Sequence, residues 1–122
     1  MLEAGKSTMI DQKIVDIAME IITEAGDARL LINEALSCIE NSDFAIADEK
    51  IILARKLLAK AHGMQTDIIQ SESEGEQHQH PLLFIHAQDS LMTINSELNM
   101  CRRLRDIFFR LDARLAVLEN SK

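Results

Sequence analysis

The sequence predicts an all-α protein, and three features of its composition carry the prediction. Aromatic residues make up only 3% of the chain, whereas β-sheets favour aromatic and β-branched side chains. The 47% of hydrophobic residues are mostly Ala, Leu, Ile and Met, and most of these residue types favour helices. Four Gly and one Pro are too few turn residues for a fold of many strands. At 122 residues, the chain is expected to form one domain over residues 1–122.

A first helix is expected over residues 10–40. Its apolar stripe is built on steps of three and four residues and comprises Ile10, Ile14, Ile17, Ile21, Leu31, Ala35 and Cys38. An interior glycine costs about 1 kcal/mol relative to alanine, so a break at Gly26 is the alternative to one long helix. The unbroken helix is favoured because neither Pro nor a cluster of turn residues accompanies Gly26. Residues 1–7 show no periodicity and are expected to fray.

A second helix is expected over residues 43–72. Asn41, Ser42 and Asp43 form a signal to stop and restart a helix, in which the Asp43 carboxylate caps the new helix. The apolar seam of this helix alternates large residues with alanine, at Phe44, Ala47, Ile51, Ala54, Leu58 and Ala61, and extends to Ile68 and Ile69. The polar residues 71–80 have nothing apolar to bury, so we expect a mobile loop there.

A third helix is expected over residues 81–117, with Pro81 in its first turn, where the missing N–H is no loss. Its second half is expected to face the core with Leu104, Ile107, Phe108, Leu111, Leu115 and Leu118. Its first half carries a mostly polar stripe with steps of 3, 4 and 3 residues, formed by Asp89, Met92, Ser96 and Asn99. Such a stripe is either solvated or buried against copies of itself, where polar groups pair across a symmetry axis. The sequence therefore predicts an antiparallel three-helix bundle that associates with its own copies.

Charge and hydropathy exclude several classes of function. The chain has 13 Lys and Arg against 20 Asp and Glu, which gives a net charge of −7. A field of that sign repels phosphate backbones and anionic lipids, so no nucleic acid and no membrane surface is an expected partner. The arginines between residues 102 and 110 are expected to form pairs within the helix, such as Arg102 with Asp106. No signal peptide and no run of about 20 apolar residues is recognised, so Cys38 and Cys101 are expected to be reduced, buried residues of a cytoplasmic protein.

The segment around His86 is the best candidate for chemistry. Asp89, Ser90 and Thr93 follow His86 by three, four and seven residues, which puts all of them on one face of a helix. Near a helix N-terminus the macrodipole favours an anion attached to the imidazole, and neutral imidazole is a competent nucleophile at cytoplasmic pH. The alternative is a structural histidine that is bonded to Asp89 at the helix surface.

The other three histidines are weaker candidates. His78 and His80 belong to the polar loop and are expected to be solvated rather than to bind a metal ion. His62, on the second helix, either supports His86 from a neighbouring helix or is a partly buried histidine bonded to the backbone.

The segment from His86 to Met92, with the sequence His-Ala-Gln-Asp-Ser-Leu-Met, resembles the active-site helix of one family. That family is the enzyme IIA component of lactose/cellobiose-type phosphotransferase systems, which includes diacetylchitobiose proteins. Its pattern at this point is His-Ala-Gln-Asp-His-Leu-Met. Further matching pieces lie in the right order at residues 25–29, 34–36, 42–44 and 61–66. The resemblance covers roughly residues 14 to 100.

The resemblance implies a homotrimer of three-helix subunits that relays a phosphoryl group from the carrier protein HPr to a cysteine of the IIB component. His86 matches the phosphorylated histidine, and Gln88 matches a residue beside the phosphoryl group. Asp89 matches an aspartate that meets its symmetry mates at the trimer axis, where one divalent cation, Mg²⁺, binds per trimer. The family's second histidine is Ser90 here; its hydroxyl still donates a hydrogen bond but supplies no charge. The alternative is a helical adaptor or regulatory paralogue that binds protein partners without carrying phosphate.

Overall fold

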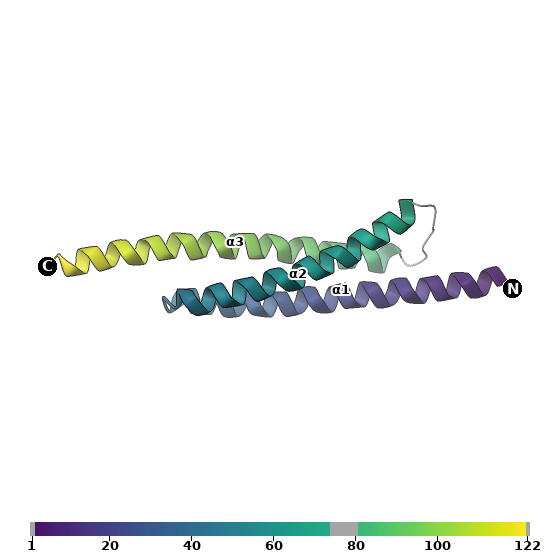
Figure 1. Ribbon diagram of the computed structural model, residues 1–122, viewed down its shortest axis with the longest axis horizontal. Helices are drawn as coiled ribbons and strands as arrows, with labels where there is room; N and C mark the ends of the chain where they lie inside the picture. Colours follow the sequence, from purple (N-terminus) through teal and green to yellow (C-terminus); the bar gives the residue numbers. More distant parts are fainter. Residues whose placement is uncertain (1, 74–80, 122) are drawn as a thin grey trace.

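The computed structural model describes the backbone of residues 2–73 and 81–121, and the side chains of residues 12–71 and 82–121. Within these ranges the chain forms three long helices and no strand. The helices are α1 (Leu2–Glu40), α2 (Phe44–Ser73) and α3 (Pro81–Asn120). Consecutive helices run antiparallel, so α1 and α3 point the same way, and the end of α3 projects past the turn between α1 and α2 (Figure 1). The prediction of an all-α three-helix fold is confirmed.

Three helix ends differ from the sequence prediction. α1 begins at Leu2 rather than near residue 10, because no proline obstructs the extension of a helix that packing stabilises further along. α2 continues to Ser73, so the first residues of the predicted polar loop are helical. α3 continues to Asn120. The rest of that loop, with His78 and His80, lies outside the described residues.

α1 passes through Gly26 without a break, as predicted. A Cβ added at Gly26 would meet nothing within 4 Å, so this glycine lies at an open surface and no close helix contact requires it. The helix therefore accepts the local cost of a glycine because packing on both sides of it holds the backbone helical.

The turn between α1 and α2 has the predicted cap. Asp43 Oδ1 accepts a hydrogen bond from the backbone N–H of Ile46 at 3.4 Å. The backbone N–H groups of Asp43 and Ser42 donate to the carbonyls of Cys38 and Ile39, at 2.8 and 3.0 Å. These two bonds form a Schellman motif, which requires a left-handed residue just after the helix. Ser42 takes that position with φ 60°, where glycine is the usual residue.

The core is a seam rich in alanine. Its members in α1 and α2 recur in steps that are mostly three and four residues: Ile14, Ala18, Ile21, Ala25, Ala28, Ile32, Ala35 and Ile39, then Ala47, Ile51, Ala54, Leu58, Ala61 and Ile68. The seam of α2 is thus nearly the predicted one. In α1 the predicted Ile17, Leu31 and Cys38 are only half-buried, because they lie at the edges of a stripe whose centre is formed by alanine and isoleucine.

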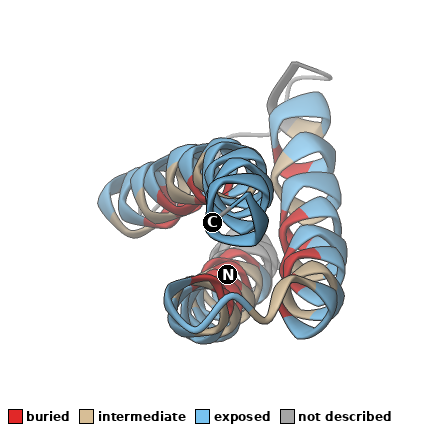
Figure 2. Cartoon of the chain, turned by 90° about the vertical axis from the view of Figure 1, so that its left-hand side faces the viewer, coloured by how far each residue is buried: buried red, intermediate tan, exposed pale blue. Residues whose placement is uncertain are grey.

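The predicted core face in the second half of α3 is wrong. The buried residues of α3 all lie in its first half: Phe84, Ala87, Leu91, Ile94, Leu98 and Cys101. From Asp106 to Ser121 every residue is exposed, including the apolar Ile107, Phe108 and Leu115. α1 ends at Glu40, so the last turns of α3 extend beyond the bundle, and Figure 2 shows exposed residues around this end of the helix.

Candidate active site on the third helix

His86 lies in the second turn of α3, and its side chain is exposed. The imidazole has no hydrogen bond or ion pair with any residue in the described part of the chain, so it is not bonded to Asp89. The structural alternative for His86 therefore lacks the contact on which it depended. An exposed imidazole close to a helix N-terminus is free to meet a partner, and the helix dipole favours negative charge on it.

Of the other predicted site residues, Ser90 lies on the same face of α3 as His86, whereas Gln88 does not. Ser90 is half-buried one turn further along the same face of α3. Gln88 is also half-buried, but two residues along a helix correspond to a rotation of roughly 200°. Gln88 therefore lies on the opposite flank of the helix. One copy of the chain brings His86 and Ser90 together, but not His86 and Gln88.

The polar stripe of Asp89, Met92, Ser96 and Asn99 is exposed along its whole length. It lies on the side of α3 away from the buried seam. Among the described residues, no three His, Cys, Asp or Glu side chains are grouped closely enough to hold a metal ion. Within the described part of one chain, Asp89 is thus a single carboxylate on an open surface and not part of a complete ligand set.

A concavity of about 550 Å³ lies between α2 and α3 beside the polar stripe. Its lining includes Arg55, His62 and Gln65 of α2, and Met92 and Asn95 of α3. His62 is exposed here rather than partly buried, and His86 is not among the lining residues. Gln65 Oε1 is the one buried side-chain oxygen or nitrogen without a hydrogen-bond partner in the described ranges. His62 therefore faces a different surface from His86 within one chain.

Arg105 joins α3 to α2. Its guanidinium group donates two hydrogen bonds to Asp48, at 2.8 and 2.9 Å, and these bonds raise the pKa of Arg105. The same group lies 4.7 Å from the ring centroid of Phe109, a cation–π distance. Phe109 in turn meets Phe44 edge to face, with the ring centroids 5.3 Å apart. This cluster holds α3 against the first two turns of α2.

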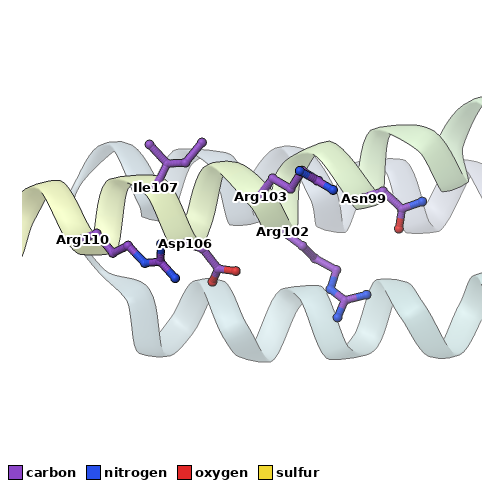
Figure 3. Close-up of a pocket in the computed structure, with 6 residues that line it drawn as sticks. All are labelled: Asn99, Arg102, Arg103, Asp106, Ile107 and Arg110. Atoms are coloured by element: carbon purple, nitrogen blue, oxygen red, sulfur yellow. The ribbon is translucent and has the colours of Figure 1, made fainter.

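The predicted ion pair between Arg102 and Asp106 is not formed. Asp106 Oδ1 instead lies 3.4 Å from Nη1 of Arg105. A concavity of about 600 Å³ opens on this side of α3 and is lined by Asn99, Arg102, Arg103, Asp106, Ile107 and Arg110 (Figure 3). The arginines were expected to pair within the helix. Two of them, Arg103 and Arg110, also keep the three- and four-residue spacing of the polar stripe, a signal that the sequence contains.

No helix in the described ranges has both the length and the apolar character that a membrane span needs.

The chain is similar to IIA components of phosphotransferase systems. The family model of the lactose/cellobiose-specific IIA subunit of the PTS system matches residues 16–108. The PTS system lactose-specific EIIA component of Lactococcus lactis subsp. lactis is 42% identical over 77 residues, which cover 63% of this chain and 73% of that protein. The lichenan-specific phosphotransferase enzyme IIA component of Bacillus subtilis is 31% identical over 99 residues, 81% of this chain and 90% of that one.

Solved structures agree with the sequence matches. The PTS cellobiose-specific enzyme IIA from Bacillus anthracis superposes with a TM-score of 0.76 at 35% identity, over 80% of this chain and 90% of that chain. The IIA(Chitobiose) protein, solved in complex with HPr from the N,N'-diacetylchitobiose branch of the Escherichia coli phosphotransferase system, gives 0.71 at 29% identity. That match covers 81% of this chain and 96% of the other. The chain therefore belongs to the lactose/cellobiose-specific IIA family of the phosphotransferase system, a family of phosphoryl carriers.

Proposed function

We propose that His86 accepts a phosphoryl group from HPr and passes it to the cysteine of a IIB component in the cytoplasm, during uptake of a lactose-, cellobiose- or chitobiose-type sugar. The observation that carries the proposal is the imidazole of His86 near the start of α3, which is exposed and has no hydrogen-bond or ion-pair partner among the described residues. It stands in the segment that matches the active-site helix of the family. A related IIA protein has been solved in complex with HPr, which supports HPr as the donor.

The transfer needs little covalent chemistry from the protein. The lone pair of His86 Nε2 attacks phosphorus, and the bond between phosphorus and the donor breaks with its electron pair leaving on the donor. The second transfer reverses the roles: the sulfur of the IIB cysteine attacks, and the electron pair of the nitrogen–phosphorus bond returns to the imidazole. Ser90 and the N-terminal dipole of α3 are placed to stabilise the phosphoryl oxygens.

Gln88 gives a reason for a homotrimer. Because it lies on the flank of α3 opposite His86, it is placed to reach a phosphoryl group on a neighbouring copy rather than on its own. The exposed polar stripe is the surface through which the copies would meet. In this arrangement each active site combines His86 and Ser90 of one copy with Gln88 of the next.

Asp89 is the proposed ligand for one divalent cation, Mg²⁺, per trimer. One copy offers a single exposed carboxylate, whereas three copies supply three oxygen donors of the kind that a hard dication prefers. The ion would offset the repulsion among the three carboxylates and takes no part in phosphoryl transfer. Asp89→Leu removes both the ion and the repulsion, so the trimer should persist in sedimentation velocity at least as well as the wild type. Loss of the trimer in this variant would contradict the axial site.

The test of the carrier function is phosphorylation by purified phosphoenolpyruvate, enzyme I and HPr, read by intact mass. The wild-type chain should gain one phosphoryl group, and His86→Gln should gain none while keeping its helix content by circular dichroism. His62→Gln is the matched control, because it removes another exposed histidine of the bundle and should still be labelled. If HPr is phosphorylated and the wild-type chain gains no mass, the adaptor alternative is correct. Phosphate mapped to another histidine would contradict the assignment of His86.

A further inference from the structure

Gly26 lacks a side chain at a position where the bundle does not require a glycine. It lies in the interior of α1, where glycine weakens a helix relative to alanine. Its backbone is helical, and a Cβ built on it would meet nothing within 4 Å. Neither an unusual backbone conformation nor a close helix contact in the described part of the chain therefore accounts for the missing side chain.

Gly26 lies beside the groove between α1 and α3 onto which His86 also opens. The two helices run the same way, and the guanidinium group of Arg29 in α1 donates two hydrogen bonds of 2.9 Å to the Glu97 carboxylate in α3. Gly26 comes one turn before Arg29, and His86 comes three turns before Glu97, so each shares a helix face with one member of this ion pair. Gly26 and His86 thus border the same groove and are separated by roughly 12 Å along the helix axes.

Exposed apolar side chains lie on both sides of Gly26. Met19 and Leu30, seven residues before it and four after it, share its flank of α1 and are both exposed. Leu82, one turn before His86 on α3, is exposed as well. The fully buried cores of protein–protein interfaces are apolar and are packed as densely as protein interiors. This flank therefore offers a partner two apolar side chains with bare backbone between them, next to the candidate nucleophile.

We propose that Gly26 is a docking position for HPr, at which the bare backbone of α1 admits a side chain of HPr between Met19 and Leu30. The inference rests on the proposed function and adds one residue of α1 to the surface that HPr meets. HPr is the occupant because it must reach His86 to transfer its phosphoryl group, and a related IIA protein has been solved in complex with HPr. A standard interface covers about 800 Å² on each partner, roughly 30 Å across, so one footprint spans both His86 and Gly26.

The experiment compares Gly26→Gln with Gly63→Gln, a matched control. Gly63 also lies inside a helix, and a Cβ there would likewise meet nothing within 4 Å. It is rotated by roughly 200° from the buried Ala61, so it faces away from the bundle. Glutamine favours a helix more than glycine does, so both variants should raise the urea midpoint of unfolding. The two substitutions thus change local helix stability alike and differ in where the new side chain stands.

Only Gly26→Gln should impair the reaction with HPr. Its KM for phosphorylated HPr should rise by about tenfold with kcat nearly unchanged, because extra atoms in a packed interface cost affinity as overpacking costs stability in a core. Gly26→Ala, with one added methyl group, should show a smaller rise. Gly63→Gln should keep the wild-type KM.

Calorimetric titration with unphosphorylated HPr separates this inference from the proposed function. A wild-type chain that binds HPr but gains no phosphoryl group contradicts the carrier function, and a loss of HPr affinity in Gly26→Gln alone would still support the docking position. Equal KM and equal HPr affinity in the two glutamine variants overturn the docking position while the carrier function stands. Weaker self-association of Gly26→Gln in sedimentation velocity would place Gly26 in a contact between copies and overturn the inference too. A wild-type chain that neither binds HPr nor is labelled overturns both.

Discussion

The two halves of α3 use apolar residues in opposite ways. In the first half, apolar side chains such as Phe84 and Leu98 are buried in the seam between the helices. In the second half, apolar side chains of the same types, such as Phe108 and Leu115, are exposed. Both halves have helical spacing of three and four residues. The difference shows that periodicity identifies a helix and its faces, whereas burial depends on whether a neighbouring helix is present at that height.

The second half of α3 is attached to the rest of the chain by polar and aromatic contacts rather than by buried apolar side chains. Ser42 Oγ donates a hydrogen bond to Asp112 Oδ1 at 3.3 Å. Phe109 and Arg105 of the Arg105 cluster lie one and two turns before Asp112 in α3. An open apolar cleft of about 580 Å³ remains between this half and the turn. The apolar side chains that line it include Leu36, Ile39, Phe44, Leu104, Phe108, Leu111 and Leu115. Polar and aromatic contacts thus hold a segment that its own chain covers only on one side.

The largest predicted effect contrasts one leucine from each half. Leu98, 3% exposed, should cost about 2–5 kcal/mol of unfolding free energy when replaced by alanine, because the truncation leaves a cavity in the seam. Leu115, 53% exposed, should cost less than about 0.5 kcal/mol. Urea denaturation at one fixed protein concentration measures both, since association would otherwise change the apparent stability. Similar costs at the two positions would contradict the contrast between the halves.

The ion pairs that join α3 to the rest of the bundle should also differ in strength. Arg105 has a side chain only 23% exposed, with two bonds to Asp48 and a stacked Phe109, so Arg105→Gln should cost about 1 kcal/mol. Arg29 makes an equally short pair with Glu97, but its side chain is 46% exposed. Arg29→Gln should therefore have little measurable effect, because water screens the pair. A double-mutant cycle with Asp48→Asn checks that the cost at Arg105 belongs to this contact.

The turn beneath the second half of α3 offers a stabilising substitution. Ser42 adopts φ 60°, and a left-handed backbone costs a residue with a Cβ about 1 kcal/mol. Ser42→Gly should therefore raise the unfolding free energy by slightly less than that amount, since the exposed bond to Asp112 is lost. Asn41→Gly is the control, because Asn41 does not have positive φ. A glycine there adds freedom to the unfolded chain and removes the exposed hydrogen bond from Asn41 Nδ2 to the Ser37 carbonyl, so it should lower the unfolding free energy. Equal effects of the two glycines would contradict this account.

The smallest predicted effect concerns the reactivity of Cys101, which lies at the boundary between the two halves of α3. Cys101, 1% exposed, is the last buried residue of α3, and burial raises the pKa of its thiol. The folded protein should therefore resist alkylation at Cys101 at neutral pH, since the thiolate is the reactive form. Met100→Cys, at a position 60% exposed, should react at the rate of a free thiol. Mass mapping of the alkylated residues distinguishes the two, and fast reaction at Cys101 would place the boundary earlier in the helix.

Much of the fold was readable from local patterns. The cap at Asp43, the alanine-rich seam of α2 and the continuity of α1 through Gly26 follow from residue types and spacing, because short-range geometry decides them. The candidate site was also readable: His86 and its neighbours form a segment whose chemistry and family likeness are both local. The spacing that Arg103 and Arg110 share with the polar stripe was also present in the sequence.

Only the tertiary structure decided which apolar stripes are buried. The sequence determined that α3 is one long helix with an apolar and a polar face in each half. It did not determine that α1 ends before the last turns of α3, so that the stronger apolar face is left open and the weaker one forms the core. The reason is physical: spacing along a helix is set by 3.6 residues per turn, whereas burial is a contact between helices distant in sequence.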